Sequence, residues 1–440
     1  MRLSSIQYAN DRISFLFLGF YKIGRSSLLM SLNSPTKSKQ QLDTQNIEID
    51  EGLIRSIFLK NRKSELFVHE STELLKETQQ YQDWFEKKED RRRTRFIARL
   101  GKANMDYINI SQDDYREFGR KGFPSEHRGS IYEHLLQLSA FESKYGVNYF
   151  SKCLKTDIPS SIGRVIQADI PRTLSSFVAT CGEVTRSTLM KMLRDVLWAF
   201  AVHKPEIGYC QSMNFVAAFF ISVFGSAKKS FYALVQLIDS PTSPYVGLHI
   251  PGYYSPGMSQ LLTDIGVLEV MAQERLGERT FREFFEAREV TSLSMIVSEW
   301  FLTCFITVFP IRTVLRLMDF FVSNCRGSNK VLFRVAFVII KELIERKREL
   351  VDLDQVMQGH KRMTKTWVRH NELIVKATMG VRFFTSKDLL HWRQVITKSA
   401  SSHSSGHGHG MPMGSTMMRL EEALAPQTQL TLTVPEDAVL

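Results

Sequence analysis

The sequence predicts an all-α protein, and two observations carry that prediction. Apolar residues recur at helical spacing through a long central zone, and no stretch sustains an apolar–polar alternation of period two. The clearest stripe repeats at i, i+3, i+4, i+7, i+8 and i+11, which places its members on one face of a helix. It consists of Leu189, Met192, Leu193, Val196, Leu197 and Phe200.

Further helices are expected between residues that typically begin or end a helix. Thr185 or Thr188 is a candidate cap for the helix that contains this stripe, and Pro205 closes it. The next segment, Met213–Phe224, is apolar nearly all round, which is typical of a helix buried on every side. Three later helices are expected over Trp300–Val308 before Pro310, Val314–Val322 before Gly327, and Val331–Ile344.

Composition limits the class of protein. The chain has 440 residues, 43% hydrophobic and 23% charged, with a formal net charge of +11, which excludes a disordered chain, a collagen-like fibre and a simple coiled coil. Its five cysteines are scattered without a C-x-x-C pair, so we expect a reducing compartment. Every apolar run is shorter than the 18 or so residues of a spanning helix, so we expect a soluble, cytoplasmic protein, at most peripheral on endomembranes.

Four zones follow from changes in composition along the chain. Residues 1–50 mix one short apolar run with Ser/Asn/Gln-rich sequence and are expected to be poorly ordered. Residues 51–117 form a charged helical extension, and residues 118–395 form the main helical domain. Residues 396–440 form a Ser/His/Gly/Met tail that cannot bury enough apolar surface to fold alone and is expected to be disordered.

The most informative residues are an arginine and a glutamine that follow two chain breaks. Pro171 disfavours helical geometry at Ile170, so Arg172 is expected in a loop or in the first turn of a helix. Asp169, three residues earlier, can orient its guanidinium. Gln211 follows the Pro205/Gly208 break and precedes the buried helix. Such a pair suits phosphoryl transfer, since a cation neutralises phosphate charge and an amide orients water, although arginines and glutamines near turns are usually only surface residues.

These residues resemble the TBC domain of Rab GTPase-activating proteins, whose motifs are I-x-x-D-x-x-R and Y-x-Q. Ile166, Asp169 and Arg172 match the first motif, and Tyr209 and Gln211 match the second. Flanking blocks are also similar, over about residues 118–395. They are Arg120–Ser125, His127–Gly129, Trp300–Leu302, Phe309–Pro310, Met318–Phe321, Asn371–Ile374 and Trp392–Arg393.

The resemblance implies a domain of two helical lobes that binds a GTP-loaded Rab-family GTPase and regulates vesicle trafficking. Arg172 would be an arginine finger supplied in trans, and Gln211 a second finger that orients the hydrolytic water. Asp169 would support the arginine, while Ile166 and Tyr209 would shape and pack the finger loops. The protein would need no cofactor of its own, because GTP and Mg²⁺ are carried by the partner GTPase.

The sequence departs from the family pattern at three positions. Tyr132 and Met318 each stand where tryptophan is usual, and both are large enough to fill a core. Ser212 replaces the usual glycine after the finger glutamine, where a side chain could crowd an approaching GTPase. Ser212 is the best sequence support for a non-enzymatic alternative, a TBC-shaped scaffold that binds a GTPase or effector without accelerating hydrolysis.

Other motifs are weaker. One is a basic cluster, called here the Arg91–Arg99 cluster, which consists of Arg91, Arg92, Arg93, Arg95 and Arg99. The default interpretation is a solvated helix face, and contact with a membrane surface is the functional alternative. Because the cluster lacks interleaved aromatic residues, no nucleic-acid binding is expected. Gly19–Ser26 fits a phosphate-binding loop except for Arg25 in place of lysine. His403, His407 and His409 lack a fourth metal ligand. Cys210, near His203 in sequence, is expected to pack beneath the finger rather than act as a nucleophile.

Overall fold

The computed structural model describes residues 72–177, 183–239, 250–290, 292–323, 329–365, 367 and 370–403. Within these ranges every regular element is a helix, so the all-α prediction is confirmed. None of the described helices is both long enough and apolar enough to cross a bilayer. The first expected zone, the phosphate-loop-like segment Gly19–Ser26, and His407 and His409 lie outside the described residues.

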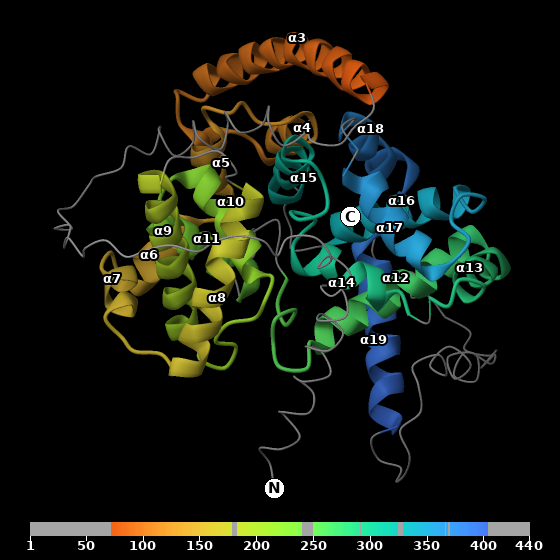
Figure 1. The fold of residues 1–440 in the computed structure, drawn as a ribbon. Helices are drawn as coiled ribbons and strands as arrows, with labels where there is room; N and C mark the ends of the chain where they lie inside the picture. The colour runs from red at the N-terminus through yellow and green to blue at the C-terminus, as the bar shows by residue number, and fades with distance from the viewer. Residues whose placement is uncertain are drawn as a thin grey trace, which may run out of the picture.

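In the first lobe the helices gather around one mostly apolar helix, α10, as Figure 1 shows on its left side. Almost every residue of α10 is buried, and it packs against α5, α8, α9 and α11. The expectation of a helix enclosed on every side is therefore confirmed. The helices of this lobe are α5 (Arg128–Leu135), α6 (Leu138–Tyr145), α7 (Tyr149–Leu154), α8 (Ser160–Phe177), α9 (Glu183–His203), α10 (Met213–Phe224) and α11 (Ala227–Ile238).

The second lobe is built around α12 and α16, which contact each other and most of their neighbours (Figure 1). Its elements are α12 (Ser259–Leu276), α13 (Glu278–Glu286), α14 (Ser294–Leu302), α15 (Ile311–Ser323), α16 (Lys330–Glu345), α17 (Leu353–Lys365), α18 (His370–Val375), the π-helical turn η4 (Lys376–Gly380) and α19 (Ser386–His403). α19 therefore continues beyond residue 395, into the segment that the sequence assigns to the tail.

Two sequence-based boundaries are wrong. α9 begins at Glu183, before both threonines that were candidates for its cap. The helix expected over Trp300–Val308 ends at Leu302, and the chain continues through tight turns. Cys304 and Phe305 have φ values of 48° and 63°, a left-handed geometry that cannot continue a right-handed helix.

The N-terminal extension is joined to the domain through α4 (Gln112–Lys121), which packs along α15. The two helices approach closely at Gly119, where a Cβ would lie 1.8 Å from Ser323 Oγ and 2.8 Å from the Asp319 carbonyl oxygen. Only glycine fits such an approach. The expected boundary at 117/118 thus falls inside a helix that belongs to the packed domain.

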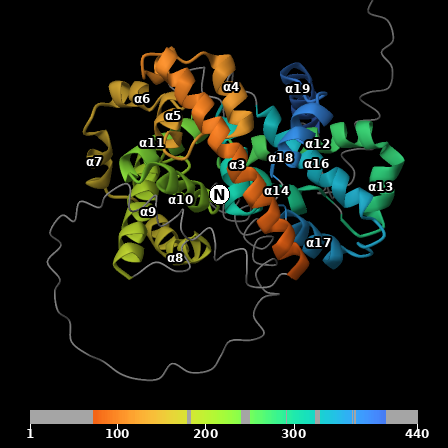
Figure 2. The same cartoon turned by 90° about the horizontal axis from the view of Figure 1, so that it is seen from above.

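α3 (Thr72–Lys102) lies across the top of both lobes, and Figure 2 shows its course from above. Phe96 and Leu100 on its inner face are fully buried, and the Phe96 ring meets Phe118 edge-on with centroids 5.1 Å apart. The short 3₁₀ turn η3 (Tyr107–Asn109) connects α3 to α4. The charged extension is consequently docked on the domain by apolar contacts.

The Arg91–Arg99 cluster takes part in this docking, so its description as a solvated face is only partly right. Arg92 Nη1 donates to the Lys121 carbonyl at 2.8 Å, and Arg99 Nη2 lies 2.5 Å from Asp114 Oδ1. Arg93 forms an ion pair with Glu126. Arg91 and Arg95 are exposed. Because Arg92, Arg93 and Arg99 pair with groups of the domain, they contribute less positive charge to a surface that could contact a membrane.

Truncation of Phe96 tests the docking of α3. We expect Phe96→Ala to lower the free energy of unfolding by about 3–5 kcal/mol, because it removes a ring that is fully buried between α3 and α4. Its neighbour Ile97 is 41% exposed, so Ile97→Ala should change stability by less than about 0.5 kcal/mol. Urea denaturation of the two variants makes the comparison. Equal effects would show that α3 is not packed as described.

Candidate functional site

Arg172 lies within α8, not in a loop or a first turn, so that prediction is wrong. α8 runs unbroken from Ser160 to Phe177 and includes Pro171. Proline removes the amide that would bond the carbonyl of Gln167, but Pro171 and Gln167 are both exposed, where water can replace the lost donor. On the opposite face Ile166 and Ile170 are buried in the core and hold the helix in place.

The Arg172 side chain extends from the exposed side of α8. It is 63% exposed, and its Nη1 lies 3.9 Å from Oδ1 of Asp169, one helical turn earlier. That distance is too long for a hydrogen bond but short enough for the carboxylate to bias the direction of the guanidinium. Asp169 itself is nearly buried, with a side chain 9% exposed. The arginine therefore reaches solvent from a base that carries an anchored carboxylate.

Asp169 connects α8 to the loop that carries the glutamine. The hydroxyl of Tyr209 donates to Asp169 Oδ2 at 2.7 Å. Burial, and next the negative charge of Asp169, raise the pKa of Tyr209 well above its usual value, so the phenol remains a donor at neutral pH. The first and second sequence motifs thus meet at a hydrogen bond between Asp169 and Tyr209.

A second, buried chain of hydrogen bonds connects the same two segments one turn further along α8. Thr173 Oγ1 donates to the Asp169 carbonyl at 2.8 Å, and Asn214 Nδ2 donates to Thr173 Oγ1 at 2.6 Å. Asn214 Oδ1 in turn accepts from the Ser212 amide at 3.0 Å. Thr173 and Asn214 were missed by the sequence analysis, because polar residues without a motif give no signal of where they are buried.

Gln211 is exposed and stands between these two anchors. Tyr209 before it donates to Asp169 of α8, and Asn214 after it donates to Thr173 of α8. These two α8 positions flank Arg172, and Ser212 is bonded to Asn214 within the loop. The loop also touches the start of α8, since a Cβ on Gly208 would lie 2.7 Å from Ile162 Cδ1. The glutamine loop therefore runs alongside α8, with the two candidate side chains on adjacent, cross-linked segments.

A family model for the Rab-GTPase-TBC domain matches residues 125–348, which include both motifs and the helices that carry them. The chain belongs to the TBC-domain family.

Relatives and solved structures agree with this assignment. Growth hormone-regulated TBC protein 1 of Xenopus laevis is 32% identical over 57% of this chain and 69% of its own length, and the Homo sapiens protein is 30% identical over 57% and 70%. The Saccharomyces cerevisiae GTPase-activating protein MSB4 is 27% identical over 54% and 52%.

The fold is also similar to two solved domains. The TBC domain of a Chlamydomonas flagellar RabGAP superposes with a TM-score of 0.52 at 20% identity, covering 66% of this chain and 95% of that one. The Ypt/Rab-GAP domain of Gyp1p gives a TM-score of 0.52 at 15% identity, covering 70% and 99%. At these identities the likeness shows the helical TBC fold.

Ser212 has a backbone conformation that explains why glycine suits this position of a TBC domain. Its φ of 90° lies in the left-handed region, which costs a residue with a Cβ about 1–2 kcal/mol. The residue is only 6% exposed. Serine at this position therefore strains the backbone of the glutamine loop. Its buried side chain presents little surface to a partner.

Replacement of Ser212 by glycine tests this explanation. We expect Ser212→Gly to raise the free energy of unfolding by up to about 1 kcal/mol, the relief of strain less the greater entropy of glycine in the unfolded chain. Ser212→Ala keeps the Cβ and should leave stability near that of the wild type. Thermal melts of both variants decide, and an equal gain for alanine would contradict the backbone explanation.

Cys210 and His203 do not form a nucleophile and base. His203 Nδ1 lies 2.8 Å from the hydroxyl of Tyr149, and its Nε2 lies 3.5 Å from Asp239. Burial raises the pKa of the Cys210 thiol to about 12, so it stays protonated at neutral pH. The thiol packs against the hydrophobic core next to the glutamine, as the sequence predicts.

The two lobes of the TBC domain are joined by a buried carboxylate, Asp319 on α15. Arg128 Nε and Nη2 donate to its two oxygens at 2.8 and 3.1 Å, the Tyr132 hydroxyl donates at 2.9 Å, and the Phe123 amide donates at 2.9 Å. Burial, and next the charge of Asp319, keep the pKa of Tyr132 far above its usual value. Tyr132 and Met318 are both fully buried, as expected of core-sized replacements for tryptophan.

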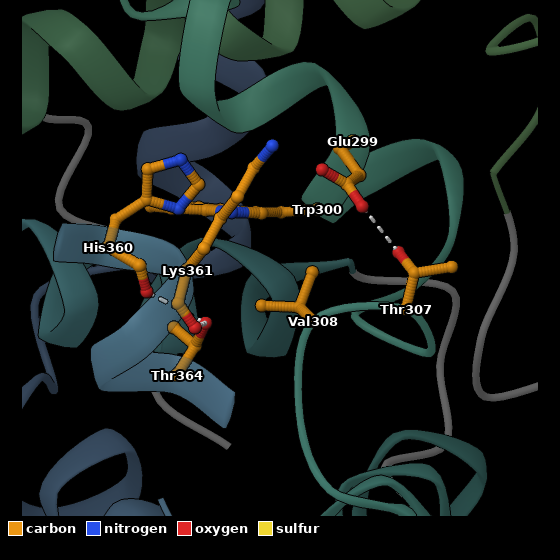
Figure 3. Close-up of a pocket in the computed structure, with 7 residues that line it drawn as sticks. All are labelled: Glu299, Trp300, Thr307, Val308, His360, Lys361 and Thr364. Atoms are coloured by element: carbon orange, nitrogen blue, oxygen red, sulfur yellow. Dashed lines mark hydrogen bonds between the residues drawn. The ribbon is translucent and has the colours of Figure 1, made fainter. Parts of the chain in front are cut away.

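A small cavity of about 100 Å³ lies in the second lobe between α14 and α17 (Figure 3), and its lining includes no residue of α8 or of the glutamine loop. Its lining includes Glu299, which accepts from Thr307 Oγ1 at 2.9 Å, and Thr364, which donates to the His360 carbonyl at 2.8 Å. Both ring nitrogens of His360 and the indole nitrogen of Trp300 are buried without a hydrogen-bond partner in the described part of the chain. Burial, and next the nearby Lys361, lower the pKa of His360 to about 3, so its ring is neutral at pH 7.

No group of three or more His, Cys, Asp or Glu side chains is placed to hold a metal within the ranges that the structure describes. The candidate metal ligands of the tail lie outside those ranges. They are the His403 side chain, His407 and His409.

The neutral state of His360 predicts a pH-dependent stability. Its folded pKa of about 3 lies below the unfolded value of about 6.5, so the unfolded chain binds the proton first and stability falls as pH drops below about 6.5. Between pH 7 and pH 5 the wild type should lose about 2 kcal/mol more than His360→Gln. His391→Gln, at an exposed position on α19, is the control and should keep the wild-type slope. Denaturant titrations at the two pH values measure the free energy of unfolding of each protein. Equal losses of stability for the wild type and His360→Gln would contradict the prediction.

Proposed function

We propose that this TBC domain accelerates GTP hydrolysis by a GTP-bound Rab-family GTPase, supplying Arg172 and Gln211 in trans, and thereby acts in vesicle traffic. The single observation that supports this most is the cross-linked geometry of the two motifs. Asp169 and Thr173 on α8 bind Tyr209 and Asn214, on either side of Gln211. Both proposed finger residues are exposed, while Asp169, Thr173 and Asn214 are buried and Tyr209 is partly buried.

In this proposal Arg172 neutralises charge that develops on the phosphate oxygens during transfer. Its guanidinium is a planar donor fork that a lysine ammonium cannot reproduce. Asp169 lies 3.9 Å away and restricts the direction of the guanidinium, and the arginine side chain, 63% exposed, extends to where a docked partner can meet it. A trans arginine finger contributes roughly 10³–10⁵ in rate, which corresponds to about 4–7 kcal/mol of barrier.

Gln211 is proposed to orient the attacking water through its side-chain amide. The loop that holds it has little freedom, because Tyr209 and Asn214 on its two sides are fixed by hydrogen bonds to α8 and the following helix α10 is buried. Preorganised donors of this kind need no reorganisation at the moment of reaction. GTP and Mg²⁺ are proposed to arrive with the partner GTPase, so the TBC domain contributes side chains alone.

Substitution of the proposed fingers tests the function. Single-turnover GTP hydrolysis would be measured across a panel of purified GTP-loaded Rab GTPases, with the full chain as activator. On a responsive GTPase, Arg172→Ala and Arg172→Lys should each reduce the stimulated rate by roughly 10³-fold or more, and Gln211→Ala by roughly 10²-fold or more.

The matched control is Arg91→Ala, which removes an exposed arginine of α3 and should leave stimulation unchanged. If both Arg172 variants stimulate as well as the wild type, the finger assignment is wrong. Association with a GTP-loaded GTPase at an unchanged hydrolysis rate would instead support the scaffold alternative.

A further inference from the structure

The exposed face of α8 continues from Arg172 toward the start of the helix. Ser161, Val165, Ala168 and Arg172 are spaced at i, i+4, i+7 and i+11, which places them in one line along the helix, and all four are exposed. Arg164 is exposed beside this line. We call Ser161, Arg164, Val165 and Ala168 the α8 face. It meets solvent next to the proposed arginine finger.

The α8 face is not required to hold the helix in the domain. Ile166, Ile170 and Thr173 on the other side of α8 are buried and supply its contacts with the core. Val165 is nevertheless a β-branched apolar residue that leaves 50% of its surface in water. Its burial by a partner would be favourable, because apolar surface gains about 25 cal/mol per Å² when it leaves water.

The spacing places the α8 face close enough to Arg172 for one protein partner to cover both. Val165 precedes Arg172 by seven residues, which is about 10 Å along a helix that rises 1.5 Å per residue. A standard interface covers about 800 Å² on each partner, a patch whose radius is about 16 Å. A patch of that size centred on Arg172 includes Val165, so a GTPase that receives the Arg172 guanidinium near the middle of its interface covers this valine.

We propose that the α8 face is the surface on which the GTP-bound GTPase is seated, with Val165 as its apolar anchor and Arg164 as a flanking cation. This inference rests on the proposed function, since the position of the partner is taken from Arg172. The small side chains of Ser161 and Ala168 let the partner approach the helix closely around the anchor. The α8 face contributes to affinity and partner choice, while Arg172 and Gln211 contribute to the rate of the bound complex.

The test separates binding from catalysis with one matched pair of substitutions. Val165→Asp places a charge in the proposed contact, and Val147→Asp places the same charge at another exposed valine, 66% exposed between α6 and α7. With a responsive GTPase from a Rab panel, Val165→Asp should raise KM by about 10-fold or more and leave kcat near the wild-type value. Val147→Asp should change neither constant, and Val165→Ile should retain the wild-type KM.

Two further measurements keep the outcomes distinct. Melting temperatures of the valine variants, all at exposed positions, should match the wild type; a Val165→Asp protein that unfolds would be replaced by Arg164→Glu, for which the same rise in KM is expected. Binding of GTPases loaded with a non-hydrolysable GTP analogue, titrated by fluorescence anisotropy, should show the same loss for Val165→Asp.

If Val165→Asp matches the wild type in KM and in binding while Arg172→Ala loses activity, the inference fails and the proposed function stands. If Arg172→Ala retains full activity, the proposed function fails, and the binding titration alone then decides whether the α8 face contacts the GTPase. Absence of binding by every GTPase of the panel to the wild-type protein would overturn both.

Discussion

The buried carboxylate of Asp319 is the constraint on which the arrangement of the two lobes depends. It lies on α15 of the second lobe and accepts hydrogen bonds from Arg128, Tyr132 and Phe123 at the start of the first lobe. A buried charge is costly unless its partners are complete, and here four donor atoms surround two oxygens. Loss of one partner of such a pair typically costs about 3–5 kcal/mol. The cluster therefore permits one relative placement of α5 and α15 and penalises others.

The finger region repeats this principle on a smaller scale. Asp169 is nearly buried, and its carboxylate accepts a hydrogen bond from Tyr209. Its backbone carbonyl accepts from Thr173, which in turn accepts from Asn214. Buried polar networks of this kind specify one geometry, because any displacement leaves a polar group without a partner. Arg172 and Gln211 are exposed at the edge of the network. Stability and function are consequently divided between residues: the buried polar groups fix the backbone, and the exposed side chains remain available to a partner.

Several elements of the fold were predictable because they depend on local patterns. The periodic apolar positions of α9 and the continuous apolar run of α10 give helices whose core faces are those expected. Pro171 is an exception, because a proline predicts a break in the helix and α8 continues through it. Burial of Ile166 and Ile170 outweighs the lost hydrogen bond there, and the exposed side of the helix tolerates it. The end of α14 at Leu302 is a second exception, because Cys304 and Phe305 turn the chain there and no neighbouring glycine or proline predicts the turn.

By itself the sequence determined the helical class, the family and the two motifs, because periodicity and short spacings are properties of neighbouring residues. It could not determine that Tyr209 meets Asp169, that Arg128 meets Asp319 across 191 positions, or that Arg92 and Arg99 hold α3 on the domain. Those pairings depend on which distant surfaces are brought together when the apolar faces of the helices are buried. The positive φ of Ser212 likewise belongs to the closed loop, since only contacts on both sides hold a serine in that conformation.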